Sequence, residues 1–205
     1  MRGQLRRHAA GRSAGGARDP LRGQASLGVE SGNGHAALYD RAMDFEDTAV
    51  RLWKSLDREE RLAAASRFFA QPSEEVLGNA LGAIIKARHL RPQVARSMPP
   101  EEQARALASV LDPGETVAAA LLVTLHLADR REMLTTFLDA LGLPHEEGIL
   151  KEEADTVGLD TARLRAGLDA LRARFPAHQV RAYLNTLWLQ DRERWDGLRQ
   201  LPDPA

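Results

Sequence analysis

Apolar residues recur every three or four positions from Asp44 to near the end of the chain, and no segment sustains the apolar–polar alternation of a strand. That spacing places apolar side chains on one face of an α-helix. The sequence therefore predicts an all-α fold, a compact bundle of about seven to nine helices joined by short turns. A short solenoid-like stack of helical hairpins is the alternative, although the signature residues of tetratricopeptide, ankyrin or HEAT repeats do not appear in register.

Residues that start and stop helices divide this region. Asp57 and Glu60 form a capping box, in which each side chain can accept from the other residue's free backbone N–H. Asp112 as N-cap, followed by Pro113 and Glu115, predicts the start of a helix that is apolar nearly all round and therefore central and buried. The expected helices cover about 44–55, 57–69, 73–89, 100–111, 113–129, 130–141, 161–175 and 177–195, with a short turn before residue 100.

Two glycines, Gly78 and Gly82, lie four residues apart inside the helix expected at 73–89. Each costs about 1 kcal/mol of helix stability relative to alanine. We therefore expect them to let a neighbouring helix approach closely.

Residues 1–42 differ from the rest of the chain because they are rich in Gly, Ala, Ser and Arg and lack apolar periodicity. Such a segment cannot bury enough surface to offset the entropy of ordering, so we expect a disordered basic tail followed by a single all-α domain at 43–201. A nucleic-acid or membrane arm and an organellar transit peptide are alternatives for the tail. Our hypothesis is that Met43 is the native start and that the tail is upstream sequence read in frame.

The composition excludes several classes of chemistry. Cysteine is absent, which excludes disulfides, thiolate zinc sites, iron–sulfur clusters and cysteine nucleophiles. The longest nearly apolar run, 117–128, is well short of the roughly 20 residues that span a bilayer, and the N-terminus lacks the apolar core of a secretory signal. We expect a soluble, cytoplasmic protein without a membrane span. Arginine outnumbers lysine 25 to 3, which indicates the high-GC composition of a bacterial-like genome.

The stretch "FLDALGLPHEEGIL" (137–150) sets a histidine beside two carboxylates. A zinc-protease helix needs a second histidine four residues after the first, and Ile149 occupies that position, so the motif is absent. Gly142 suits the left-handed residue after a helix end. Pro144 is then expected to begin a new helix with its glutamates near the positive end, which leaves only His145 unexplained.

A second histidine, His126, lies inside the expected central helix with Asp129 one turn further on, a spacing that allows the two side chains to pair. Helical di-metal sites need Glu-x-x-His twice, and this chain has none. Nucleophile elbows and phosphate-binding loops are also absent. We expect a hydrogen-bonded core histidine, no enzyme activity, no metal and no cofactor. A helical enzyme with a site near His126 and His145 is the second alternative function.

Two windows of the sequence, 86–96 and 172–181, contain several cations and no acidic residue. Cations near helix C-termini complement the helix dipole, which is the structural interpretation. If the windows meet on one surface they form an anion or partner patch, and an anion- or nucleic-acid-binding regulator is the first alternative function. The acidic body and the lack of interleaved aromatics argue against nucleic acid without excluding it. The candidate residues are Lys86, Arg88, His89, Arg91, Arg96, Arg172, Arg174 and Arg181.

The three tryptophans complete the candidate residues. Trp53 and Trp188 fall on apolar stripes and are expected in the core. Trp195 stands among charges, so it either closes the edge of the core or is an exposed anchor for a partner. Together with the missing catalytic motifs, these features predict a non-enzymatic protein–protein interaction module that binds another protein or a second copy of itself as a homodimer.

Overall fold

The computed structural model describes residues 43–156 and 158–204. All described residues belong to one compact unit. The predictions for residues 1–42 therefore lie outside the described residues. Within the described ranges the protein is all-α except for one short hairpin, which confirms the predicted fold class. No helix in these ranges is long and apolar enough to cross a membrane.

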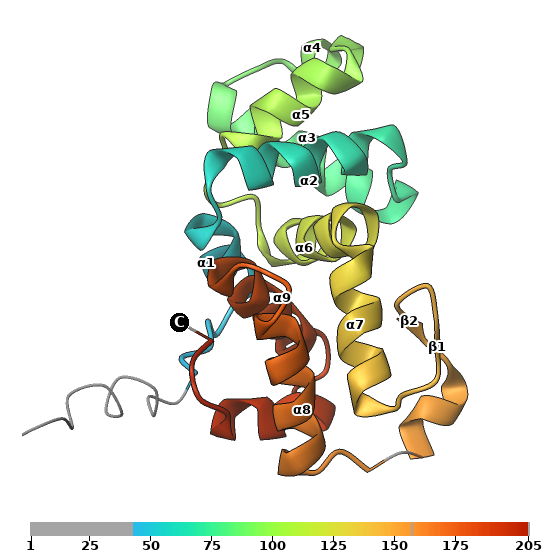
Figure 1. The fold of residues 1–205 in the computed structure, drawn as a ribbon. Coiled ribbons are helices and arrows are strands. Elements are labelled where there is room, and N and C mark those ends of the chain that lie inside the picture. Colours follow the sequence, from blue (N-terminus) through green and yellow to red (C-terminus); the bar gives the residue numbers. More distant parts are fainter. Residues whose placement is uncertain (1–42, 157, 205) are drawn as a thin grey trace, which may run out of the picture. The chain divides into compact units, whose positions relative to one another are not determined.

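The described ranges contain ten α-helices and two strands (Figure 1). The first six helices are α1 (Ala49–Ser55), α2 (Arg58–Ala70), α3 (Glu74–Arg88), α4 (Pro92–Ser97), α5 (Pro100–Ala108) and α6 (Glu115–Asp129). They are followed by α7 (Arg131–Leu141), β1 (His145–Glu146), β2 (Ile149–Leu150), α8 (Thr161–Arg172), α9 (Ala177–Gln190) and α10 (Arg192–Trp195), with 3-10 turns at Glu152–Thr156 and Asp196–Gln200.

Two clusters of buried side chains form the core. The first is built mainly by α1, α2, α3, α5 and α6, and the second mainly by α7, α8, α9 and α10. Helix α6 contacts α1, α2, α3, α7 and α9, which confirms that it is the central helix. The segment before α1 joins the second cluster. Met43 donates its backbone N–H to the Leu201 carbonyl at 3.1 Å, and the ring centroid of Phe45 lies 5.4 Å from that of Trp188 in a tilted arrangement.

Several boundaries differ from the prediction. Residues Pro92–Ser97 form a helix where a turn was expected, and Asp191 divides the last long helix by capping the N–H of Arg194 at 3.0 Å. Helix α6 begins only at Glu115. The Glu115 carboxylate instead accepts from the N–H of Ala49 at 2.9 Å, so it caps α1 across space.

The prediction that Gly78 and Gly82 admit a neighbouring helix is wrong for the helices of the described ranges, since none of them packs there. Both are exposed, and a Cβ built on either would meet no atom within 4 Å apart from the backbone of its own helix and its chain neighbours. The close helix contact is made by Gly167 of α8, where a Cβ would lie 2.6 Å from Cε2 of Phe137 in α7. A side chain at that position would force α7 and α8 apart.

The helix predicted to begin at Pro144 is replaced by a hairpin. As predicted, Gly142 ends α7 in the left-handed region. Its N–H donates to the backbone carbonyl of Asp139 at 3.0 Å, and the N–H of Leu143 donates to the carbonyl of Leu138 at 2.9 Å. The chain then turns at Glu147 (φ 50°) and Gly148 (φ 89°), the pair of positive φ angles that a tight two-residue hairpin turn requires.

Candidate functional site

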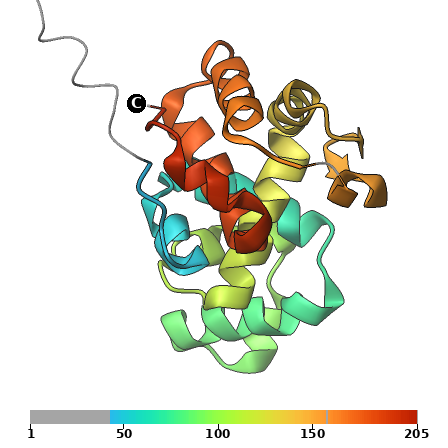
Figure 2. The same ribbon diagram turned by 90° about the horizontal axis from the view of Figure 1, so that it is seen from below.

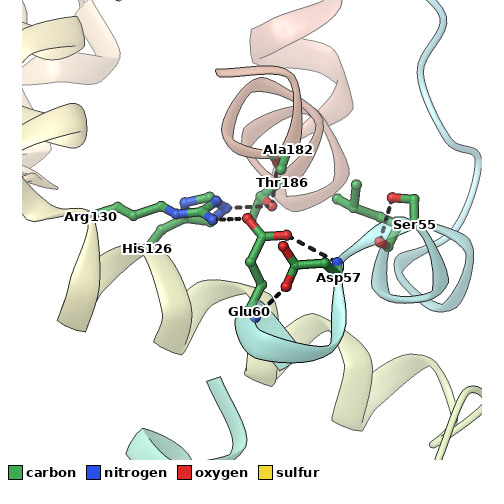
Figure 3. A network of polar contacts seen from close by, with 8 residues as sticks. Ser55, Asp57, Glu60, His126, Arg130, Ala182 and Thr186 are labelled. Atoms are coloured by element: carbon green, nitrogen blue, oxygen red, sulfur yellow. Dashed lines mark hydrogen bonds and ion pairs between the residues drawn. The ribbon is translucent and has the colours of Figure 1, made fainter. Parts of the chain in front are cut away.

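A buried polar network joins α2, α6 and α9 (Figure 3). Glu60 forms an ion pair with Arg130, and the two side chains are only 14% and 8% exposed. The other oxygen of the Glu60 carboxylate accepts from the N–H of Asp57 at 3.2 Å, and the N–H of Glu60 donates to Asp57 Oδ1 at 2.8 Å. The predicted capping box is thus confirmed, and its glutamate also neutralises a buried arginine that the sequence did not indicate.

His126 makes the contact between α6 and α9 in this network. Its Nε2 is 3.1 Å from the Thr186 hydroxyl oxygen, and that hydroxyl donates to the Ala182 carbonyl at 2.8 Å. The threonine oxygen must therefore accept from His126, which assigns the proton to Nε2 and leaves Nδ1 as an acceptor. Burial, assisted by the charge of Arg130, lowers the pKa of His126 to about 3. The imidazole is neutral near pH 7.

Both candidate histidines have partners within the fold, and His126 is a buried, hydrogen-bonded histidine as expected. Asp129 does not pair with His126. Its Oδ1 lies 2.8 Å from Nε of Arg67 instead. His145 places Nε2 at 3.0 Å from Asp139 and accepts the N–H of Gly148 on Nδ1 at 3.3 Å, so it closes the hairpin. No cluster of three or more potential metal ligands occurs in the described part of the chain.

An apolar hollow of about 410 Å³, the α6–α9 groove, lies beside this network. Its walls come from α6, α7, α9 and the hairpin, and their apolar members are Val123, Leu127, Leu134, Leu138, Ile149, Leu150 and Leu187. Ile149 is 61% exposed. His126, Tyr183, Thr186 and Gln190 supply the polar groups of the lining.

Tyr183 is a third buried polar side chain of this groove, beside His126 and Thr186. It is 2% exposed, its ring centroid lies 5.4 Å from that of His126, and its hydroxyl has no hydrogen-bond partner among the described residues. His126 Nδ1 also lacks one. Burial raises the pKa of Tyr183, so its hydroxyl keeps its proton. The sequence did not indicate Tyr183, because its period places it in a core stripe like any apolar residue.

A polar hollow of about 430 Å³ lies on the other side of α9, and five carboxylates border it. Three of these already have protein partners: Asp57 and Glu60 hold the capping box, and Asp203 pairs with Arg181 at 2.6 Å. Three of the five carboxylates that border this hollow are therefore already bound by other groups of the fold.

The structure does not bring the two basic windows together. Window 86–96 occupies the end of α3, the left-handed residue His89 and α4, whereas window 172–181 occupies α8, α9 and the turn between them. These elements lie far apart in both Figure 1 and Figure 2. The arginines of the second window have partners in the fold: Arg172 binds the carbonyls of Pro202 and Asp203, Arg174 pairs with Glu132, and Arg181 pairs with Asp203.

The first window is different. None of its cations pairs with a carboxylate in the described ranges, and Arg88 makes only a 3.5 Å contact with the Ser109 hydroxyl. Beside Lys86, a groove of about 620 Å³ separates α3 from the loop between α5 and α6. Leu111 in this loop is 51% exposed. We call Gly78, Gly82, Lys86 and Leu111 the α3 surface.

Trp195 cannot serve as an exposed anchor, so that alternative is wrong. It is 2% exposed and its ring centroid lies 6.0 Å from Phe137 in the second core cluster. Trp53 and Trp188 are buried as predicted, at 0% and 6% exposure.

Comparisons with protein-family models, curated proteins and solved structures gave no match.

Proposed function

We propose that this protein is a non-enzymatic interaction module that binds a helix of another protein on its α3 surface. This proposal rests on one observation: a Cβ on Gly78 or Gly82 would meet no atom beyond its own helix backbone within 4 Å, and Gly82 lines an open groove. Glycine inside a helix costs about 1 kcal/mol relative to alanine, and no helix in the described ranges benefits from the space it leaves. A helix of a partner can approach the bare backbone there.

The chemistry of the surface favours an amphipathic helix with acidic residues. Leu111, half exposed beside the groove, offers an apolar contact of the kind that helix-in-groove partners bury. Lys86, Arg88 and Arg91 lack carboxylate partners among the described residues, so acidic side chains on the incoming helix would neutralise them. We place this function in the cytoplasm, as the sequence predicts.

The test is recovery of a partner from the protein's own host by the tagged full chain, with wild type compared with Leu111→Asp and Lys86→Glu. We expect an identified partner whose recovery falls about tenfold with either variant, since loss of about 1.4 kcal/mol reduces affinity by that factor. Ile149→Asp is the matched control, because it adds the same charge at a more exposed residue away from α3.

Three outcomes would overturn the proposal. One is equal recovery of every partner by all variants. A second is self-association in sedimentation that Leu111→Asp abolishes, which would assign the surface to a second copy of this chain. The third is binding of duplex DNA that Lys86→Glu weakens and that declines steeply with salt, which would indicate phosphate contacts.

A further inference from the structure

We propose that the α6–α9 groove is a binding site for a small aliphatic alcohol, whose chain lies along the leucines and whose hydroxyl meets Tyr183 and His126. This site is separate from the α3 surface and does not depend on the function proposed there. It would give the protein a small-molecule ligand in addition to a protein partner.

The size and lining of the groove suit an apolar ligand. Its volume of about 410 Å³ falls in the range of small-molecule sites, which are mostly apolar with a few placed polar groups. Five of its twelve lining residues are leucines, which come from three helices and the hairpin. Gly148 packs closely against Leu134, another residue of the lining, because a Cβ at Gly148 would lie 2.8 Å from Cβ of Leu134.

Two buried polar atoms in this lining remain unpaired by the fold. Tyr183 is 2% exposed and His126 is 3% exposed, yet neither the Tyr183 hydroxyl nor His126 Nδ1 has a hydrogen-bond partner in the described part of the chain. Buried polar groups are nearly always paired, because an unmade hydrogen bond away from water is costly. A ligand that supplies the missing partners recovers that cost.

The hydrogen-bond pattern selects the ligand's polar group. His126 Nδ1 can only accept, since the proton is on Nε2 facing Thr186, and the Tyr183 hydroxyl has a free proton to donate. A hydroxyl is the smallest neutral group that can donate to the first and accept from the second. The two rings are neighbours, with centroids 5.4 Å apart.

Charged head groups fit less well. A carboxylate would lose its hydration between leucine walls and would face the lone pair of a neutral imidazole. An ammonium has no lone pair and cannot accept from the Tyr183 hydroxyl. An ether or ketone cannot donate to Nδ1.

The experiment is a titration of the ¹⁵N-labelled full chain with 1-octanol, followed through the backbone amide signals. We expect saturable shifts at Gly148, Leu150 and Tyr183 and no comparable shifts on α3. 1-Methoxyheptane has a chain of similar length without a donor, and we expect it to bind about tenfold more weakly than the alcohol. Octanoate is expected to bind more weakly still.

Tyr183→Phe keeps the ring and removes only the unpaired hydroxyl, so we expect it to fold and to bind 1-octanol about tenfold more weakly. Thr124→Val is the matched control, because the Thr124 hydroxyl bonds to Ala120 within α6 and does not line the groove.

Absence of saturable shifts at the groove overturns the proposal. So does equal binding of the alcohol and the ether by wild type, a result that does not depend on whether the variant folds. Tighter binding of octanoate would overturn the neutral head group.

Discussion

Lys86 and Arg172 stand in sequence windows that look alike, each rich in cations and free of acidic residues. In the half built around the first core cluster, Lys86 and its neighbours have no carboxylate partner among the described residues. In the half built around the second, Arg172 and Arg181 hold the C-terminal segment through Asp203. Cations in such a window stay available at the surface unless another segment of the chain supplies carbonyl or carboxylate groups that bind them.

The glycines repeat this contrast. Gly82 in the first half faces open space, whereas Gly167 in the second half lies against Phe137. The same residue type therefore leaves a surface bare in one half and brings two helices together in the other.

The largest expected effect concerns the ion pair that joins α2 to the end of α6. Arg130→Met leaves the Glu60 carboxylate buried without its cation, and we expect the free energy of unfolding to fall by about 3–5 kcal/mol in urea denaturation. Arg67→Met is the matched control, because its pair with Asp129 is 59% exposed on the arginine side and should cost less than about 1 kcal/mol. Equal losses would mean that burial of the Glu60–Arg130 pair does not add to its contribution to stability.

The glycine contrast is tested by two identical substitutions. Gly167→Ala places a Cβ against the Phe137 ring, and we expect it to destabilise the protein by about 1–3 kcal/mol. Gly82→Ala meets open space in a helix and should stabilise the protein by roughly 1 kcal/mol. Thermal and urea unfolding of both variants measure the two signs. Stabilisation by Gly167→Ala would contradict the close packing of α7 and α8.

Acid should weaken the junction between the halves through His126. In the unfolded chain this histidine gains a proton as the pH falls below about 6.5, whereas in the folded protein, with a pKa of about 3, it stays neutral. The unfolded state binds more protons between these values, so stability falls with falling pH by about 1.4 kcal/mol per unit.

At pH 5 the loss is therefore about 2 kcal/mol relative to pH 7. Urea denaturation at both pH values measures it, and His126→Leu should remove most of that difference. The exposed His178→Gln variant serves as the control and should retain it. An unchanged pH dependence in His126→Leu would show that other groups cause the acid sensitivity.

The smallest effect compares the two windows directly. Arg172→Ala removes hydrogen bonds to the carbonyls of Pro202 and Asp203, and we expect a loss of about 1 kcal/mol with faster amide exchange around Leu201. Lys86→Ala should change stability by less than about 0.5 kcal/mol. If the two variants cost the same, the windows do not differ in their structural role.

Local signals predicted much of the fold because they act within one helix turn. The Asp57–Glu60 box and the left-handed Gly142 both involve backbone groups a few residues away, and both occur as expected. The apolar surround of α6 predicted its central position, because a helix without a polar face has to be covered on all sides. His126 was a candidate residue because a titratable side chain is unusual on a helix that is expected to be buried.

The misassigned features all depend on contacts between distant segments. Glu115 was expected to support its own helix and instead caps α1, because α1 begins beside it in space. Trp195, surrounded by charges in the sequence, is buried because α10 turns it onto Phe137. The hairpin after Pro144 follows from two consecutive residues with positive φ at Glu147 and Gly148, and the flanking glutamates had suggested a helix start.

By itself, the sequence determined the all-α class, the central helix and most helix ends, since periodicity and capping are local properties of the chain. Only the tertiary structure decided which glycine brings helices together, which cations remain free, and that Tyr183 joins His126 in one apolar groove. Those properties depend on which side chains meet across the fold. His126 and Tyr183 are 57 positions apart, and a single sequence does not show that two such distant residues are in contact.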